Sequence, residues 1–224
     1  MPDFNGFPRD AARFLTELSV HNERAWFEAN RRRYDDGLVE PARALVDALG
    51  PRLQAISPSV RYESKVNRSL FRIQRDTRFS ADKRPYKEHL DVMFWCGDEH
   101  RNAAGYFLRI TGAELVIGAG RHVMSPEQIA RWRELVLDER GGAFIDAAAA
   151  SARAAGFAIS EPGYKRVPAG LPADHPRAGW LRQKDFNAFL RGPHPEELGQ
   201  SAFVDWCAER LVHLAPVLAV TEGL

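Results

Sequence analysis

The stretch GYFLRITGAELVIG, residues 105–118, decides the fold of this chain. Apolar side chains recur at every second position from Tyr106 to Ile110, which is the period of a half-buried β-strand. Residues 111–113 contain a glycine and lead directly into a second strand-like run at 114–118. Two such runs joined by so short a connection predict an antiparallel hairpin.

Further strands are expected on both sides of this hairpin. Residues 69–75 alternate, with Phe71 and Ile73 on one face, and residues 90–96 form an apolar run of strand length. Residues 181–190 are ambiguous, and we favour a strand there. Because short connections between neighbouring strands imply antiparallel pairing, we expect a central antiparallel sheet of about four to six strands.

Apolar residues at helical spacing predict helices before and after this strand-rich centre. The expected helical segments are 8–18, 22–38, 45–49, 126–136, 143–155 and 201–214. We expect Asn22 to cap the second of them, and Ser125 and Gln128 to form a capping box. Pro41 is expected to kink or restart a helix, and Gly141-Gly142 to separate two helices.

Helices that flank a central run of strands favour an α+β fold over alternating βαβ units. No internal repeat or low-complexity linker divides the sequence, so we expect one domain over residues 1–224. The segment 161–180 is rich in proline and glycine and fits no period, which predicts a long ordered loop or a lid.

The composition is typical of a globular protein and excludes a disordered chain. Of the 224 residues, 45% are hydrophobic and 27% are charged. Two cysteines, Cys96 and Cys207, are too few for a disulfide framework, so we expect buried thiols and a reducing compartment. We find no signal-peptide pattern and no run of about 18 apolar residues, so we expect a cytoplasmic protein with no membrane association. The 7 histidines are scattered without ligand spacing, so no metal and no cofactor are expected.

The net charge of +1 hides an uneven distribution. Residues 65–87 hold eight basic and two acidic residues, a local charge of +6 that leaves −5 for the rest of the chain. Such a segment creates a local positive field that the whole-chain charge does not reveal.

Within that segment, residues 72–87 allow two interpretations. Guanidinium groups stay charged and match phosphate and carboxylate in a bidentate manner, so the arginines could hold an anion. Alternatively, Asp76 and Asp82 could pair with the arginines and tie the loop to the sheet. If the strand continues, Arg72, Asp76 and Arg78 lie on one side and Arg75 on the other, which divides the cluster. The surplus of positive charge favours the anion site, because an unpaired buried charge is expensive.

The same segment resembles the defining motif of a bacterial protein family of unknown function. That motif is Arg-x-x-Arg-Asp-x-Arg-Phe followed by Asp or Asn, Lys and Tyr, and its positions here are Arg72, Arg75, Asp76, Arg78, Phe79, Asp82, Lys83 and Tyr86. Weaker resemblance extends to residues 22–27, 105–107 and 118–121, so it covers most of the chain. The resemblance implies family membership and brings no activity with it.

The candidate site residues follow from this segment and from one glycine-rich stretch. Candidate catalytic residues are Asp76, Asp82 and Tyr86, and candidate ligand-binding residues are Arg72, Arg75, Arg78, Lys83, Lys87 and Arg121. Arg121 is included because Gly118-Ala119-Gly120 precedes a capped helix, and helix N-termini attract anions. His89 and His122 are the histidines most favourably placed to act as a general base.

Three functions remain open from the sequence. The first is binding of an anionic small molecule, with or without catalysis. The second is a protein-interaction domain whose motif is a structural ion-pair network, which predicts paired arginines and an exposed apolar patch. The third, nucleic-acid binding, predicts an exposed aromatic such as Phe79 or Tyr86, and the acidic remainder of the chain argues against it.

Overall fold

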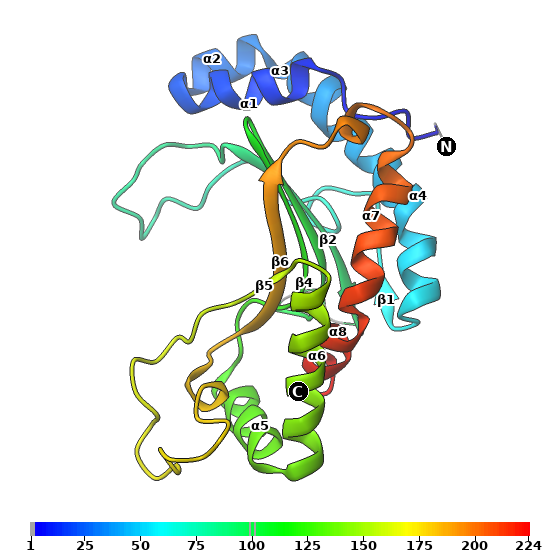
Figure 1. Ribbon diagram of the computed structural model, residues 1–224. Helices are drawn as coiled ribbons and strands as arrows, with labels where there is room; N and C mark the ends of the chain where they lie inside the picture. The colour runs from blue at the N-terminus through cyan, green and yellow to red at the C-terminus, as the bar shows by residue number, and fades with distance from the viewer. Residues whose placement is uncertain (1–2, 99, 101) are drawn as a thin grey trace.

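The computed structural model describes residues 3–98, 100 and 102–224 and has an α+β fold, as expected (Figure 1). Its sheet has six strands in the order β1-β2-β3-β4-β6-β5, with every neighbouring pair antiparallel. The strands are β1 (Val60–Arg61), β2 (His89–Cys96), β3 (Gly105–Thr111), β4 (Glu114–Arg121), β5 (Ala158–Ile159) and β6 (Phe186–Pro193). The strand count lies within the range that the sequence predicts.

The hairpin predicted at residues 105–118 is confirmed as β3 and β4. Its turn is closed by the Thr111 hydroxyl, which accepts hydrogen bonds from the backbone N–H groups of Ala113 (3.1 Å) and Glu114 (2.8 Å). Gly112 is required at the turn because a Cβ there would collide with Thr16 of α1. The hairpin therefore meets the first helix at its tip.

The helices of the described residues are more numerous than the sequence predicts, and the helix expected at 22–38 is divided into α2, α3 and η1. They are α1 (Asp10–Val20), α2 (Arg24–Ala29), α3 (Arg31–Tyr34), the π-helix η1 (Asp35–Val39), α4 (Glu40–Ile56), α5 (Pro126–Leu137), α6 (Glu139–Ala154), α7 (Phe203–Leu211) and α8 (Ala215–Glu222). Three short 3-10 helices complete the set: η2 (Trp180–Arg182), η3 (Glu196–Gly199) and η4 (Val212–Leu214).

The core lies between one face of the sheet and the helices α4, α7 and α8. Val92, Leu108 and Ile117 are paired across β2, β3 and β4 and point into this core, where each is at most 1% exposed. In Figure 1 these helices lie on one side of the sheet, and the segments 72–88 and 160–183 extend on the other. The strand residues between the core positions therefore point toward the second face.

Several expected helix boundaries are wrong. Asn22 does not cap α2, and its side chain forms hydrogen bonds with the backbone of Tyr86 instead. The expected restart at Pro41 agrees with the structure: the π-helix η1 ends at Val39, and Pro41 lies in the first turn of α4, which begins at Glu40. Gly141-Gly142 lies inside α6, and the break falls at Asp138, which caps that helix by accepting from the Gly141 N–H at 2.7 Å. The capping box of Ser125 and Gln128 is confirmed.

The strand expected at residues 69–75 is not formed. Only isolated bridges join Leu70 to Val92 and Gln74 to Tyr86. Pro85 has no N–H to donate, so the ladder around it is limited to the bonds Arg75 N to Pro85 O and Lys87 N to Ile73 O, both 2.8 Å. Residues 72–88 therefore form a narrow arm that projects from the sheet, as Figure 1 shows.

Candidate functional site

The root of the arm is anchored to the N-terminal helices through Tyr86. The Asn22 side chain donates to Tyr86 O at 3.1 Å and accepts from Tyr86 N at 3.0 Å. The Tyr86 ring stacks on Phe27, with ring centroids 4.2 Å apart. Burial raises the pKa of the Tyr86 hydroxyl. Tyr86, a candidate catalytic residue, thus holds the arm in place in this structure.

The two candidate acids of the arm, Asp76 and Asp82, form ion pairs with arginines of the arm. Asp76 accepts from Arg78 at Nε (3.0 Å) and Nη2 (2.7 Å). Asp82 accepts from Arg84 Nη2 at 2.7 Å and from Arg75 Nη1 at 2.6 Å. Hydrogen bonds from Arg78 lower the pKa of Asp76 to about 2, and those from Arg84 and Arg75 lower the pKa of Asp82 further. Carboxylates with such low pKa values are weak bases, so these pairs favour a structural role.

The tip of the arm exposes one aromatic ring. Phe79 is 95% exposed, and the guanidinium carbon of Arg78 lies 5.8 Å from its ring centroid. Lys83 donates from Nζ to the backbone oxygen of Thr77 at 2.9 Å, which closes the tip. The arm therefore presents an apolar ring to solvent beside charges that are paired within the arm.

A second group of charges, which the sequence reasoning did not assemble, lies where the arm returns to the sheet. Asp91 on β2 accepts from Arg109 on β3 at Nε (2.6 Å) and Nη2 (3.2 Å). Its carboxylate also lies 3.2 Å from Nε2 of His89 and 3.8 Å from Nζ of Lys87. The positive charge of Arg72 also acts on this group, since it contributes to the lowered pKa of Lys87. We call these five residues the Asp91 cluster.

The Asp91 cluster lies on the face of the sheet opposite the core. Asp91 alternates along β2 with the buried Leu90 and Val92, and the antiparallel register places Arg109 directly opposite it. The Asp91 side chain is only 17% exposed, whereas that of Arg109 is 46% exposed. A largely buried carboxylate is therefore surrounded by cations that still reach solvent.

Positive charge exceeds negative charge in the Asp91 cluster. Burial acts to raise the pKa of Asp91, but hydrogen bonds from His89 and Arg109 outweigh it and bring the pKa to about 2. The pKa of Lys87 is lowered, first by burial and then by Arg109 and Arg72, against the opposing effect of Asp91. Lys87 and Arg109 bring two positive charges to the single carboxylate of Asp91, and Arg72 adds to the positive field at Lys87, so the cluster is electrostatically complementary to a further negative group.

Arg121 lies away from the Asp91 cluster, on the core face of the sheet. It is 8% exposed and donates from Nε and Nη2 to the oxygen of Thr221 in α8, at 3.3 and 3.2 Å, and from Nη1 to the oxygen of Asn102. Burial lowers its pKa. The stretch Gly118-Ala119-Gly120, from which we expected an anion site before the capped helix, is part of β4. The positive charge of Arg121 therefore meets the Thr221 carbonyl at the C-terminal end of α8.

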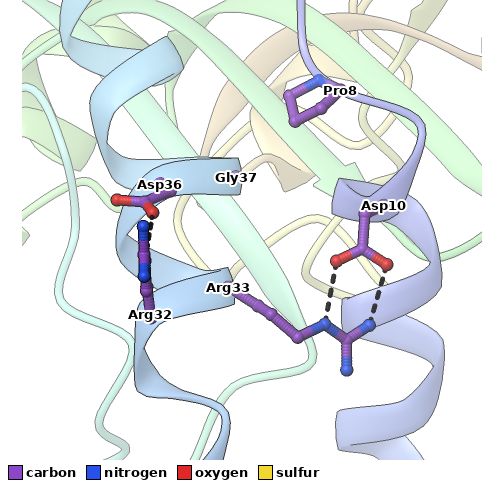
Figure 2. Close-up of a pocket in the computed structure, with 6 residues that line it drawn as sticks. All are labelled: Pro8, Asp10, Arg32, Arg33, Asp36 and Gly37. Atoms are coloured by element: carbon purple, nitrogen blue, oxygen red, sulfur yellow. Dashed lines mark hydrogen bonds and ion pairs between the residues drawn. The ribbon is translucent and has the colours of Figure 1, made fainter.

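Two shallow pockets of the described residues lie elsewhere. One of about 420 Å³ is lined by Pro8, Asp10, Arg32, Arg33, Asp36 and Gly37 (Figure 2). Figure 2 shows that its arginines point at acids of the same pocket: Arg33 holds Asp10 at 2.8 and 2.9 Å, and Arg32 holds Asp36 at 3.1 Å. Another, of about 430 Å³, contains the pair Arg52 and Asp205. Neither pocket offers the surplus positive charge of the Asp91 cluster.

A weak sequence signal for the cluster did exist. His89 and Asp91 stand two positions apart at the start of an otherwise apolar run, and Arg109 interrupts the next apolar run. Polar residues at alternate positions of a strand share its second face. Which residue of one strand faces which residue of the next depends on register, so the pair of Asp91 and Arg109 was not predictable from either strand alone.

Two properties of the described residues bear on the nature of the site. They contain no group of three or more His, Cys, Asp or Glu side chains arranged to hold a metal ion. None of their helices combines the length and the apolar character that crossing a membrane requires.

Comparison with known proteins identifies a family and no individual relative. Neither the curated proteins nor the solved structures yielded a match to this chain. The family match spans residues 10–219 and therefore includes the arm, the Asp91 cluster and the helices that anchor them. The expected membership of an uncharacterised family is confirmed: the chain belongs to DUF2461, a family described as conserved hypothetical proteins.

Proposed function

We propose that the protein binds an anionic small molecule, through a phosphate or carboxylate group, at the Asp91 cluster. The observation that carries the proposal is the charge balance around Asp91. Arg72, Lys87 and Arg109 contribute three positive charges to one carboxylate on a face of the sheet that solvent reaches. A bound anion would offset the excess of positive charge around Asp91.

Arg109, Lys87 and Asp91 have distinct parts in this binding. Arg109 is already oriented by its two hydrogen bonds to Asp91, which leaves other donors of its guanidinium for a ligand. Lys87 is half-buried beside Asp91, and its Nζ lies 5.2 Å from the ring centroid of Phe71. Asp91 is the positioning residue, since it holds both cations without neutralising them.

The site uses only part of the basic segment. Of the candidate ligand-binding residues, Arg72 and Lys87 belong to the Asp91 cluster, whereas Arg75 and Arg78 are engaged by Asp82 and Asp76. Lys83 closes the tip of the arm. The division follows from geometry, because the arm carries its tip away from the face of the sheet on which Asp91 lies.

The test is calorimetric titration of the purified protein with inorganic phosphate and with dicarboxylates, at low and at high salt. We expect binding that weakens with salt and a loss of about tenfold or more in Lys87→Met, since one charge-assisted hydrogen bond disappears. Arg78→Met is the matched control: it removes an arm cation outside the cluster and should leave affinity unchanged. The proposal is wrong if none of these anions binds, or if both variants weaken binding equally.

A second candidate function, contact with a protein partner, is supported by the exposed ring of Phe79. The arm carries six basic and three acidic residues, so its charge is +3 and suits an acidic surface with an apolar pocket. Three of its arginines are paired with acids of the arm, so the exposed ring and the remaining positive charge are what a partner would meet. Nucleic acid is the weaker interpretation, because Tyr86 is buried and leaves Phe79 alone for stacking.

A photo-crosslinking residue at position 79 tests this second function. We expect it to capture a protein whose binding can be reconstituted with the purified partner and is lost in Phe79→Ser. The same residue placed at position 61, on β1, is the control. Capture of nucleic acid at position 79, or equal capture at both positions, contradicts a protein contact at the tip.

A further inference from the structure

The face of the sheet that carries Asp91 also carries a row of apolar side chains. The register pairs Met93 on β2 with Phe107 on β3. Beyond Phe107 the row continues to Gly118 on β4 and Phe189 on β6. These positions alternate with core residues along their strands, so their side chains point away from the core. Met93, Phe107 and Phe189 are half-buried, and we call these three residues the apolar row.

Two members of the apolar row lie against the backbone of the neighbouring strand. A Cβ on Gly118 would lie 2.5 Å from Cζ of Phe107, so the Phe107 ring extends across β4 into space that a side chain would otherwise take. In the same way, a Cβ on Gly105 would lie 3.1 Å from Cε of Met93. Glycine permits such close approach because it has no Cβ. The row is therefore a low apolar surface on the sheet.

Solvent reaches the part of the face around the apolar row. The side chains of Arg109 and Arg191 are 46% and 60% exposed. Ala158 on β5, which is paired with Phe189 and extends the row by one strand, is also exposed. In Figure 1 the arm and the segment 160–183 leave the sheet on this side, at its two ends. A ligand can therefore reach the row along an open face and needs no closed cavity.

The surplus positive charge next to the apolar row is that of the Asp91 cluster. Arg109 and Phe107 are two positions apart on β3, so they lie about 7 Å apart along the strand and on the same face. Arg191 is also two positions from Phe189, but its guanidinium lies 3.9 Å from Glu114, which offsets its charge. An anion bound at Arg109 would therefore have the apolar row within reach of a short chain.

Charge and apolar surface so arranged are complementary to a ligand that has both properties. Covering apolar surface that water would otherwise contact stabilises a complex roughly in proportion to the area covered. A purely polar anion would leave the apolar row in water, whereas an uncharged apolar molecule would leave the charge around Asp91 without a further partner. A negatively charged group that carries a short apolar chain satisfies both parts of the surface.

We infer that the ligand of the Asp91 cluster is an amphiphilic anion, a carboxylate or phosphate monoester whose charged group lies at Lys87 and Arg109 and whose apolar chain lies over Phe107. This inference rests on the proposed anion binding. The chain lies on an open face, so each methylene is only partly removed from water. Its contribution to affinity is therefore smaller than the factor of about four that full burial of a methylene gives.

The test separates the apolar chain from the charge. Calorimetry compares acetate, butyrate and hexanoate, with inorganic phosphate as the polar anion and 1-hexanol as the uncharged chain. We expect affinity to rise along the carboxylate series, to about tenfold or more between acetate and hexanoate, because four more methylenes leave water in part. We expect 1-hexanol to bind at least about tenfold more weakly than hexanoate, because it forms no charge-assisted hydrogen bond.

Two phenylalanine variants locate the chain. Phe107→Ala should reduce the gain from acetate to hexanoate and leave the affinity for phosphate unchanged. Phe144→Ala is the matched control, since it removes a ring that is 45% exposed on α6, and it should leave the whole series unchanged. Circular dichroism and melting curves show whether Phe107→Ala is folded. If it does not fold, Met93→Gln replaces it, with the same expected result.

Each outcome bears on one of the two proposals. If phosphate binds and hexanoate binds no more tightly than acetate, the amphiphile inference is overturned while anion binding stands. A gain with chain length that persists in the variants of the apolar row, or equal binding of 1-hexanol and hexanoate, also overturns the inference. If none of the anions binds, both proposals are wrong.

Discussion

The side-chain amide of Asn22 forms two hydrogen bonds with the backbone of Tyr86. Its nitrogen donates to Tyr86 O at 3.1 Å, and its oxygen accepts from Tyr86 N at 3.0 Å. Both residues are buried, at 8% and 6% exposure. One side chain from the N-terminal helices therefore replaces a β-ladder partner for a residue at the root of the arm, 64 positions away in the chain.

Replacing Asn22 by alanine should destabilise the protein. The change leaves a buried N–H and a buried C=O of Tyr86 without partners, so we expect a loss of about 2–4 kcal/mol in the free energy of unfolding. Urea denaturation measures it. Asn22→Asp is the informative companion: it retains the acceptor and loses the donor, so its effect should lie between those of the unaltered protein and Asn22→Ala if the ring of Tyr86 stays in place. A loss of less than about 0.5 kcal/mol in the free energy of unfolding of Asn22→Ala would contradict a stabilising role for these two hydrogen bonds.

Protonation of Asp91 should lower the stability of the protein in acid. Its pKa in the folded protein is about 2, below the ordinary value of 3.8, so the native state favours the ionised form. The resulting stability is fully present above pH 4 and is lost as the pH falls from about 4 toward 2; the shift corresponds to about 2 kcal/mol. Unfolding free energies measured across this range should fall, and Asp91→Asn should remove this part of the fall.

Asp76 provides the comparison for that experiment. Its pKa is also about 2, but the Asp76 side chain is 42% exposed and its ion pair is surrounded by water. Solvent screening makes exposed pairs weak. We therefore expect Asp76→Asn to leave the acid dependence of stability nearly unchanged, and equal effects of the two substitutions would contradict the structural difference between them.

Arg121 should contribute to stability and not to anion binding. Its guanidinium holds carbonyl oxygens of Thr221 and Asn102, and methionine in its place would leave them without these donors. We expect Arg121→Met to lower the free energy of unfolding by about 1–3 kcal/mol and to bind phosphate with unchanged affinity. Denaturation and calorimetry on the same preparation test both parts. A selective loss of phosphate binding with no loss of stability would instead make Arg121 a ligand residue.

Both thiols should be unreactive in the native protein. Cys207 is fully buried, and Cys96 is 8% exposed. Burial raises the pKa of Cys96 to about 11 and raises that of Cys207 further, so little thiolate is present at neutral pH. A colorimetric disulfide reagent should react slowly with the folded protein and quickly with both thiols after denaturation. Rapid reaction of one thiol in the native state would show that its segment opens.

Local chemistry explains why some elements were predictable. The β3–β4 hairpin follows from a two-residue period and a turn closed by Thr111, and the capping box needs only Ser125 and Gln128, three positions apart. These features involve neighbours in the chain. The break between α5 and α6 was misplaced for a similar local reason, because Asp138 offers a cap. Gly141 and Gly142 stay inside α6, where a Cβ would collide with Leu135 of α5 and with Arg177, respectively.

The sequence by itself determined the α+β composition, the hairpin and the concentration of positive charge in residues 65–87. The tertiary structure alone decided how that charge is used. It pairs Arg75 and Arg78 with acids of the arm, turns Arg121 toward α8, and brings Lys87 to Asp91 and Arg109. The physical reason is that residue type alone gives the charge of a side chain. Its partner depends on strand register and on the face of the sheet toward which the side chain points.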